Sequence, residues 1–240
     1  MCDDLIVTHF FKASVNGSTK VLTETADAHV FVQNEPLNQL WMFFPAAVQA
    51  NQLDAWLDKH LSDHPAGKGF KSWSFTSYNK DAALKMYKDW NAASFDALYE
   101  MRLPALGPGS SRDSCPIGYN IRKDPTFLKS HDPDHSSDAF IQAETTLTIV
   151  DERSGRIAGF VTYLVDAETQ RVYISAIETF PDFRRRGLAK ALMMRSLESE
   201  KEGYTIWLTV FAENFGAAAL YFGLGFKVHR CLWVVGGANP

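Results

Sequence analysis

ISAIETFPDFRRRGLAKALMM, residues 174–194, carries the strongest structural signal in the chain. Its first part is rich in β-branched residues as a strand is, Pro181 ends that run, and Gly187 opens a segment with helical apolar spacing. A strand that passes through a short turn into a helix places unpaired backbone N–H groups and the positive end of the helix dipole at the turn. The sequence therefore predicts a site for a phosphate or pyrophosphate at the start of this helix.

The turn itself carries residues that suit a bulky anion. Gly187 and the small Ala189 would let a phosphate approach the backbone closely, and Arg184, Arg185 and Arg186 add positive charge. The alternative is a solvated basic turn that happens to precede a helix, and the three arginines alone do not decide between the two.

Around this junction the chain changes from regularly spaced strands to alternating strands and helices. Strands are expected over 145–152, 156–166, 171–180, 204–211 and 226–235, and helices over 187–201 and 214–224. We therefore predict a mixed α/β fold, with a mostly antiparallel sheet that carries helices on its faces.

Residues 1–70 are interpreted as an N-terminal α/β extension of unknown role, and residues 72–240 as the main domain. Within the extension we expect strands over 5–13 and 29–33, a turn between them at 16–18, and a helix after Pro45. The main domain is expected to begin with a strand in WSFTSYN, residues 73–79. One long helix over 81–103 and a loop to Gly118 are expected to follow.

The composition favours a reduced cytoplasmic protein. The formal net charge of −4 gives no indication of a nucleic acid or membrane partner. Cys2, Cys115 and Cys231 are odd in number and far apart, which fits free thiols better than disulfides. The acidic start MCDDLIVTHFFKAS differs from a secretory leader, and no apolar stretch approaches the ~20 residues of a spanning helix.

Two motifs of this region occur in matching order and context. The first is Arg184-x-x-Gly187-x-Ala189, between a strand and a helix. The second is Asn214-x-x-Ala217-x-x-Leu220-Tyr221-x-x-x-Gly225-Phe226, in the helix after the next strand. Together they resemble the GNAT superfamily of N-acetyltransferases over residues 72–236. The resemblance implies a splayed central sheet and acetyl-CoA as co-substrate, with no metal.

The resemblance also implies a set of cofactor-binding residues. The loop amides would cradle the pyrophosphate of acetyl-CoA, the strand before the loop would carry a bulge and expose its backbone to the pantetheine amides, and the Asn at the next helix would contact the pantetheine arm or order the turn. The residues implied are Ile177, Glu178, Thr179, Arg184, Arg185, Arg186, Gly187, Leu188, Ala189, Lys190 and Asn214.

Two side chains are candidates for catalysis. The resemblance places Tyr221 near the thioester sulfur, where a phenol can protonate the departing thiolate, although a core aromatic would occupy the same position. Glu178 is the nearest carboxylate that could accept the ammonium proton, and the alternative is a strand-end Glu that faces solvent or pairs with an Arg. Backbone N–H groups near Thr179 could polarise the thioester carbonyl.

Two further features need an interpretation of their own. His131-Asp132-Pro133-Asp134-His135 holds four potential metal ligands, but we interpret it as a solvated loop that could attract an amine cation. The chain also ends soon after FKVHRCLWVV, where the family adds a seventh strand, so that strand is missing or replaced by another segment. We expect the N-terminal extension to cover that edge or to form part of the acceptor wall.

Three functions are consistent with these observations. The first is acetyl transfer to a primary amine of a small molecule, which the acidic loop and the negative charge favour. The second is acetylation of a protein lysine or N-terminal amine, and the third is a non-catalytic acyl-CoA-binding module. The oligomeric state is open, with a homodimer as one expectation. Fold analogy carries the reaction class and not the substrate.

Overall fold

The computed structural model describes residues 19–24, 30–34, 38–44, 49–60, 70–104, 115–131, 145–198 and 203–238. The strands are Thr19–Glu24 (β1), Val30–Asn34 (β2), Gln39–Phe44 (β3), Ser72–Ser77 (β4), Ser94–Leu103 (β5), Tyr119–Lys123 (β6), Thr145–Asp151 (β7), Ile157–Asp166 (β8), Arg171–Thr179 (β9), Thr205–Phe211 (β10) and Lys227–Ala238 (β11). The helices are Leu53–His60 (α2), Lys80–Asp89 (α3), Phe127–His131 (α4), Leu188–Glu198 (α6) and Phe215–Gly223 (α7), with short 3-10 turns at Ala50–Gln52 (η1) and Pro181–Phe183 (η3).

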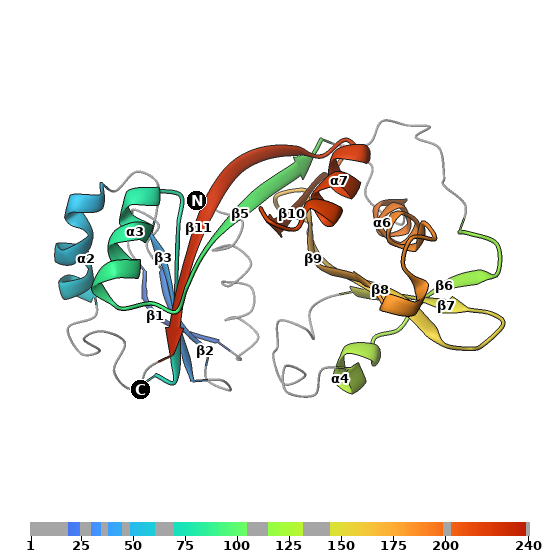
Figure 1. Cartoon of the computed structure of the whole chain (residues 1–240), viewed down its shortest axis with the longest axis horizontal. Helices are drawn as coiled ribbons and strands as arrows, with labels where there is room; N and C mark the ends of the chain where they lie inside the picture. Colours follow the sequence, from blue (N-terminus) through green and yellow to red (C-terminus); the bar gives the residue numbers. More distant parts are fainter. Residues whose placement is uncertain are drawn as a thin grey trace.

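The strands of these segments form one sheet, in the order β1-β2-β3-β4-β11-β5-β10-β9-β8-β7-β6. Among the neighbours in this sheet, β3–β4 and β9–β10 are parallel and the others are antiparallel. Figure 1 shows two groups of helices and strands that are joined by the long strands β5 and β11. The predicted mixed, mostly antiparallel sheet with flanking helices is confirmed.

The C-terminal elements follow the sequence prediction closely. The three expected strands of the meander are β7, β8 and β9, and the strands expected over 204–211 and 226–235 are β10 and β11. The helix expected over 187–201 begins at Leu188 and is described to Glu198. The helix expected over 214–224 is α7.

The long helix expected over 81–103 is wrong, because this range forms a helix and then a strand. Asn79 caps α3 by accepting hydrogen bonds from the backbone N–H groups of Asp81 (3.0 Å) and Ala82 (3.2 Å). The helix ends before Asn91, which has a left-handed backbone (φ 47°). β5 then hydrogen-bonds to β10 on one side and β11 on the other, and this tertiary pairing overrides its helix-favouring composition.

The sheet opens between β9 and β10, as the resemblance implied. The parallel pairing of the two strands stops at Ile174 and Leu208, although both strands continue beyond these residues. β9 also shifts register against β8, between the Thr162–Ala176 and Tyr163–Ile174 pairs, which is a β-bulge. The half of β9 beyond the bulge is therefore hydrogen-bonded to β8 on one edge and faces the opening with the other.

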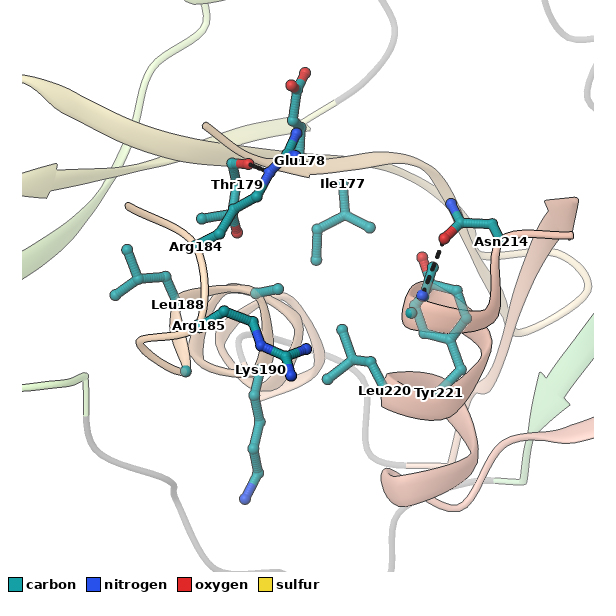
Figure 2. A pocket seen from close by; sticks show the side chains of 14 residues that line it. Ile177, Glu178, Thr179, Arg184, Arg185, Leu188, Lys190, Asn214, Leu220 and Tyr221 are labelled. Carbon is teal, nitrogen blue, oxygen red and sulfur yellow. Dashed lines mark hydrogen bonds between the residues drawn. The ribbon is translucent and has the colours of Figure 1, made fainter. Parts of the chain in front are cut away.

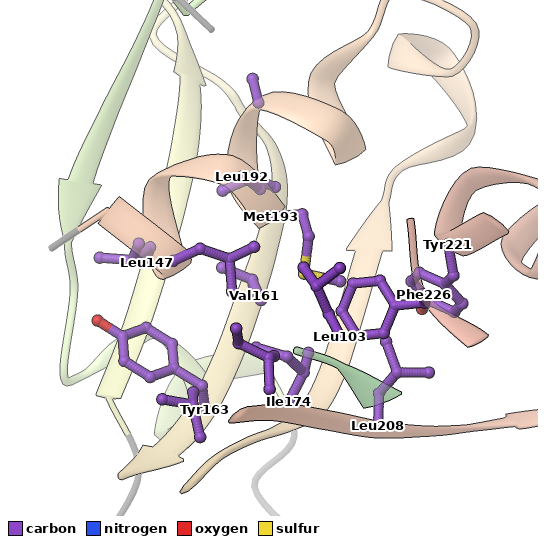
Figure 3. Packing of buried hydrophobic residues seen from close by; sticks show 14 of the residues in the cluster. Leu103, Leu147, Val161, Tyr163, Ile174, Leu192, Met193, Leu208, Tyr221 and Phe226 are labelled. Atoms are coloured by element: carbon purple, nitrogen blue, oxygen red, sulfur yellow. The ribbon is translucent and has the colours of Figure 1, made fainter. Parts of the chain in front are cut away.

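The two larger apolar cores of the described residues lie under the two groups of helices. In the first, Leu192 and Met193 of α6 face Val161 and Ile174 of the sheet, as Figure 3 shows. The second lies between α2, α3 and the strands β3 and β4. The first core includes Met101 and Leu103 of β5, and the second includes Val235 of β11.

The described part of the N-terminal extension is not detached from the main domain. The strand expected over 29–33 is β2, whereas residues 5–13 and the turn at 16–18 lie outside the described residues. β2 pairs with β3, which pairs in parallel with β4, and β4 covers the outer edge of β11. The position between β10 and β11, where a seventh strand could close the sheet, is held by β5.

Candidate active site

The loop between β9 and α6 contains backbone conformations with positive φ, which few residues other than glycine adopt easily. Pro181 starts the short turn η3. Arg185 and Gly187 then have positive φ angles of 65° and 78°, and α6 begins at Leu188. A Cβ built on Gly187 would meet no atom within 4 Å, so the glycine leaves open space beside the first backbone N–H groups of α6.

A pocket lies at this loop, between β9, α6 and the start of α7. Its cavity volume is about 540 Å³, which is in the range of cofactor sites. The sequence-predicted site residues that line it are Ile177, Glu178, Thr179, Arg184, Arg185, Gly187, Leu188, Ala189, Lys190, Asn214 and Tyr221. Figure 2 shows these residues around the opening between β9 and α7. The structure therefore brings together residues that are up to 44 positions apart in the sequence.

The three arginines of the loop have different positions. Arg184 and Arg185 line the pocket, and the Arg184 Nε donates a hydrogen bond to the backbone oxygen of Thr179 (3.0 Å). Arg186 is not among the lining residues. Its guanidinium donates to the Tyr119 hydroxyl (2.8 Å) and to the Asp182 backbone oxygen (2.9 Å), which ties the loop to β6.

The last residues of β9 present both backbone and side chains to the site. Their inner edge pairs with β8, where Ile177 lies opposite Val161, and their outer edge lies beyond the last pair with β10. In Figure 2 the Ile177 side chain points into the pocket, whereas the Glu178 carboxylate points away from it on the other face of the strand. Glu178 is partly buried. It can therefore meet a molecule that approaches from the face opposite the pocket.

Asn214 and Tyr221 are placed by α7. The Asn214 side-chain oxygen caps this helix by accepting a hydrogen bond from the Ala217 backbone N–H (3.1 Å). Tyr221 lies two turns further on, is 5% exposed and packs against Phe226 with ring centroids 5.8 Å apart. Burial raises the pKa of Tyr221 to about 12, because the phenolate is poorly solvated there. The phenol is therefore neutral, and a hydrogen-bond donor, at physiological pH.

Sequence reasoning missed Gly159, which shapes β9 from the neighbouring strand. A Cβ at this position would lie 2.4 Å from the Glu178 backbone oxygen, so a side chain here would displace the strand segment that lines the pocket. A glycine inside an otherwise apolar strand can indicate such a close approach. Gly216 was also missed, and it lines the pocket beside Asn214.

Only His131 of the His131–His135 cluster is described, and it is packed in an aromatic group. Its ring stacks on Phe127 (4.9 Å between centroids) and contacts Phe160 and Phe180. Residues 132–135 lie outside the described residues. Within the described ranges, no three His, Cys, Asp or Glu side chains gather to hold a metal ion. Among the described helices, none has the length and apolar character needed to cross a bilayer.

Residues 116–226 match the family model of the acetyltransferase (GNAT) family. Curated relatives include the [ribosomal protein bS18]-alanine N-acetyltransferases of Escherichia coli K12 and Salmonella typhimurium, each 37% identical over 88 residues. The match covers 36% of this chain and 58% of each relative, so the chain spans less than two thirds of their length.

Solved structures are similar over almost the whole chain. A GCN5-related N-acetyltransferase from Sphaerobacter thermophilus has a TM-score of 0.60 at 15% identity, over 91% of this chain and 83% of its own. A tandem GNAT protein from the clavulanic acid biosynthesis pathway has a TM-score of 0.66 at 10% identity, over 97% and 88%. One from Kribbella flavida has a TM-score of 0.62 at 13% identity, over 98% and 95%. At these identities the likeness concerns the fold alone.

Proposed function

This chain carries an acetyltransferase domain of the GNAT family over residues 116–226, and on that premise we propose that it transfers an acetyl group from acetyl-CoA to a primary amine. The observation that carries the proposal is the pocket between β9, α6 and α7. It combines a helix N-terminus, two arginines and an exposed strand edge at the place where the sheet opens.

The cofactor would bind along the opening of the sheet. The pyrophosphate would lie at the first N–H groups of α6, beside Gly187 and the guanidinium groups of Arg184 and Arg185. The pantetheine amides would pair with the free backbone edge of residues 177–179, and Asn214 would hold the turn at which α7 begins. This arrangement would bring the thioester close to Tyr221.

Acetyl transfer requires attack by the amine, stabilisation of the oxyanion, departure of the thiolate and removal of a proton from the nitrogen. The neutral amine attacks the thioester carbonyl, and a C–N bond forms while the oxygen takes up negative charge. The C–S bond then breaks, the thiolate of CoA leaves, and the nitrogen loses one proton. We assign acceptance of that proton to Glu178, directly or through water. The neutral Tyr221 phenol donates a hydrogen bond to the departing sulfur. Because burial raises the pKa of Tyr221, the CoA thiolate is a weaker base than the Tyr221 phenolate. The phenol therefore donates a hydrogen bond to the sulfur and keeps its proton.

We propose a small-molecule amine as the first acceptor class. We also propose that the reaction takes place in the cytoplasm. The formal net charge of −4 supports a cationic acceptor. A second candidate is the N-terminal amine of a protein. It is favoured by the curated relatives, which are named for acetylation of an alanine of a ribosomal protein. The same chemistry would serve both acceptors.

The test is release of the CoA thiol from acetyl-CoA by the purified protein, with a panel of small amines, lysine peptides and peptides that begin with alanine. Turnover with one class, lost in Gly187→Asp and slowed in Tyr221→Phe, would support the proposal and identify the acceptor class. Cofactor binding without turnover on any amine would favour a binding module. Absence of acetyl-CoA binding would refute the proposal.

A further inference from the structure

The order of elements in the first part of the chain is repeated in the second. The series β1-β2-β3-α2-β4-α3-β5 corresponds, element by element, to β7-β8-β9-α6-β10-α7-β11. In each series an antiparallel meander is followed by a helix that crosses over to a parallel strand, and then by a second helix and a long last strand. In the sheet order the two series run in opposite directions from a common centre.

Single residues correspond as well. Leu53 and Leu188 are one pair of corresponding residues, and Asn79 and Asn214 are another. The separation along the sequence is the same in both pairs. Leu53 and Leu188 are the first residues of α2 and α6, and each is 1% exposed. Asn79 and Asn214 each cap the following helix by accepting a hydrogen bond from the backbone N–H three residues later, at 3.2 and 3.1 Å. Two pairs of helix starts with the same sequence separation indicate that the chain contains two copies of one unit.

The last strands of the two copies are exchanged. β5 follows the first series but lies beside β10 of the second, and β11 follows the second but lies beside β4 of the first. Each brings apolar side chains to the other copy's core. In the centre, Ala97 and Trp233 form a pair across β5 and β11. They are equivalent residues. Ala212, the residue after β10, donates a backbone hydrogen bond to Ala97, and its counterpart Ser77 in β4 pairs with Trp233.

In the first copy an ion pair bridges the two helices at the positions that line the pocket in the second. In the second copy Ala189 of α6 and Leu220 of α7 line the pocket. At the same spacing the first copy has Asp54 and Lys85, whose side chains form an ion pair of 3.1 Å from α2 to α3. Lys85 also binds Asp89, and the two carboxylates raise the pKa of its amine, the Asp89 hydrogen bond most.

The loop before α2 also lacks the features of an anion site. Gln52 stands where the second copy has Gly187, and Gln49 stands in the position of Arg184. The sequence from Gln49 to Gln52 contains no cation that could neutralise a pyrophosphate. A carboxylate at the position of Ala189 would repel one.

We propose that residues 19–103 are a second copy of the catalytic unit whose cofactor cleft is closed by the Asp54–Lys85 pair and which completes the catalytic sheet with β5. The two halves then fold as one cooperative structure, and the chain holds one cofactor. The statement about the cofactor rests on the proposed function, whereas the exchange of strands does not.

Hydrogen exchange of the full chain, read by mass spectrometry under native conditions, tests the exchange of strands. Met86→Ala removes a side chain of the first copy's core that is 1% exposed. We expect the protection of the slowest amides to fall by about 30-fold or more, and by the same factor in β3 and in β8. Lys88→Ala, on the exposed face of the same helix, is the control and should change neither. A loss confined to residues 38–89 would overturn the proposal.

Calorimetric titration with acetyl-CoA tests the closed cleft. The wild-type chain should bind one molecule and Gly187→Asp none. Two molecules per chain, or one in the Gly187→Asp variant, would overturn the closed cleft. A wild-type chain that binds no acetyl-CoA would overturn the proposed function instead, and hydrogen exchange would still decide whether the two halves share their strands.

Discussion

Gly159→Ala is the substitution that tests most sharply how the sheet shapes the pocket. An added Cβ would lie 2.4 Å from the Glu178 backbone oxygen and 3.1 Å from the Thr179 Cα, whereas ordinary contacts begin at 3.4 Å. The overlap with the oxygen is therefore roughly 1 Å and involves backbone on both sides, so that β8 and β9 must separate.

The size of the effect follows from that displacement. Overpacking of this kind costs about 1–3 kcal/mol, and a thermal midpoint shift of roughly 2–4 °C is expected for each kcal/mol in a chain of this length. The moved segment is the one assigned to the pantetheine amides. If between half and all of the cost falls on these contacts, the Kd for acetyl-CoA rises by roughly 2- to 150-fold.

The assay combines calorimetric titration of acetyl-CoA with a thermal melt of each variant. Gly223→Ala is the matched control, because a Cβ there would meet no atom within 4 Å and the residue lies in α7 outside the pocket lining. Gly159→Ala should lower both affinity and midpoint, and the control neither. A lower midpoint with unchanged affinity would show that residues 177–179 do not hold the cofactor, and would refute this part of the account.

Further predictions concern side chains of the loop and of α7. Tyr221→Phe should lower kcat by roughly 10- to 100-fold with little change in KM for acetyl-CoA, and an unchanged kcat would remove the phenol from the mechanism. The free energy of unfolding should contain a Tyr221 contribution that is complete below pH 10 and is lost as the pH rises to about 12. The reason is that the phenol ionises near 10.0 in the unfolded chain and near 12 in the folded one. Chemical denaturation across this pH range measures the loss, which should vanish in Tyr221→Phe. Arg184→Ala should raise the KM for acetyl-CoA about tenfold, whereas Arg186→Ala should lower the melting midpoint and leave that KM unchanged, because Arg186 binds Tyr119 and Asp182. Equal KM values for the two variants would contradict these assignments.

The catalytic half could be predicted from the sequence because its signals are local. Pro181 and Gly187 mark a strand, a turn and a helix within a few residues, and Asn214 marks the start of α7. The meander of β7, β8 and β9 shows β-rich strands separated by turn residues at regular intervals. These local patterns predict most of the pocket-lining residues.

The remaining parts depend on contacts between distant segments. β5 has a helix-favouring sequence and becomes a strand because β10 and β11 pair with both of its edges. The role of Gly159 depends on the carbonyl of Glu178 in the next strand. Arg186 stands in the same basic triplet as Arg184, but its position depends on Tyr119, 67 residues away. Local periodicity contains none of this information.

Calorimetric titration of acetyl-CoA into three proteins shows whether the cofactor binds at the start of α6. Gly187→Asp places a carboxylate at the proposed pyrophosphate site, at a φ of 78°. Gly155→Asp introduces the same side chain at a φ of 69° in the turn between β7 and β8, also in open space and away from the pocket. Backbone strain is therefore matched between the two variants. We expect binding by the wild-type chain and Gly155→Asp and none by Gly187→Asp; equal binding by all three, or none by the wild-type chain, would contradict a cofactor site at this helix start.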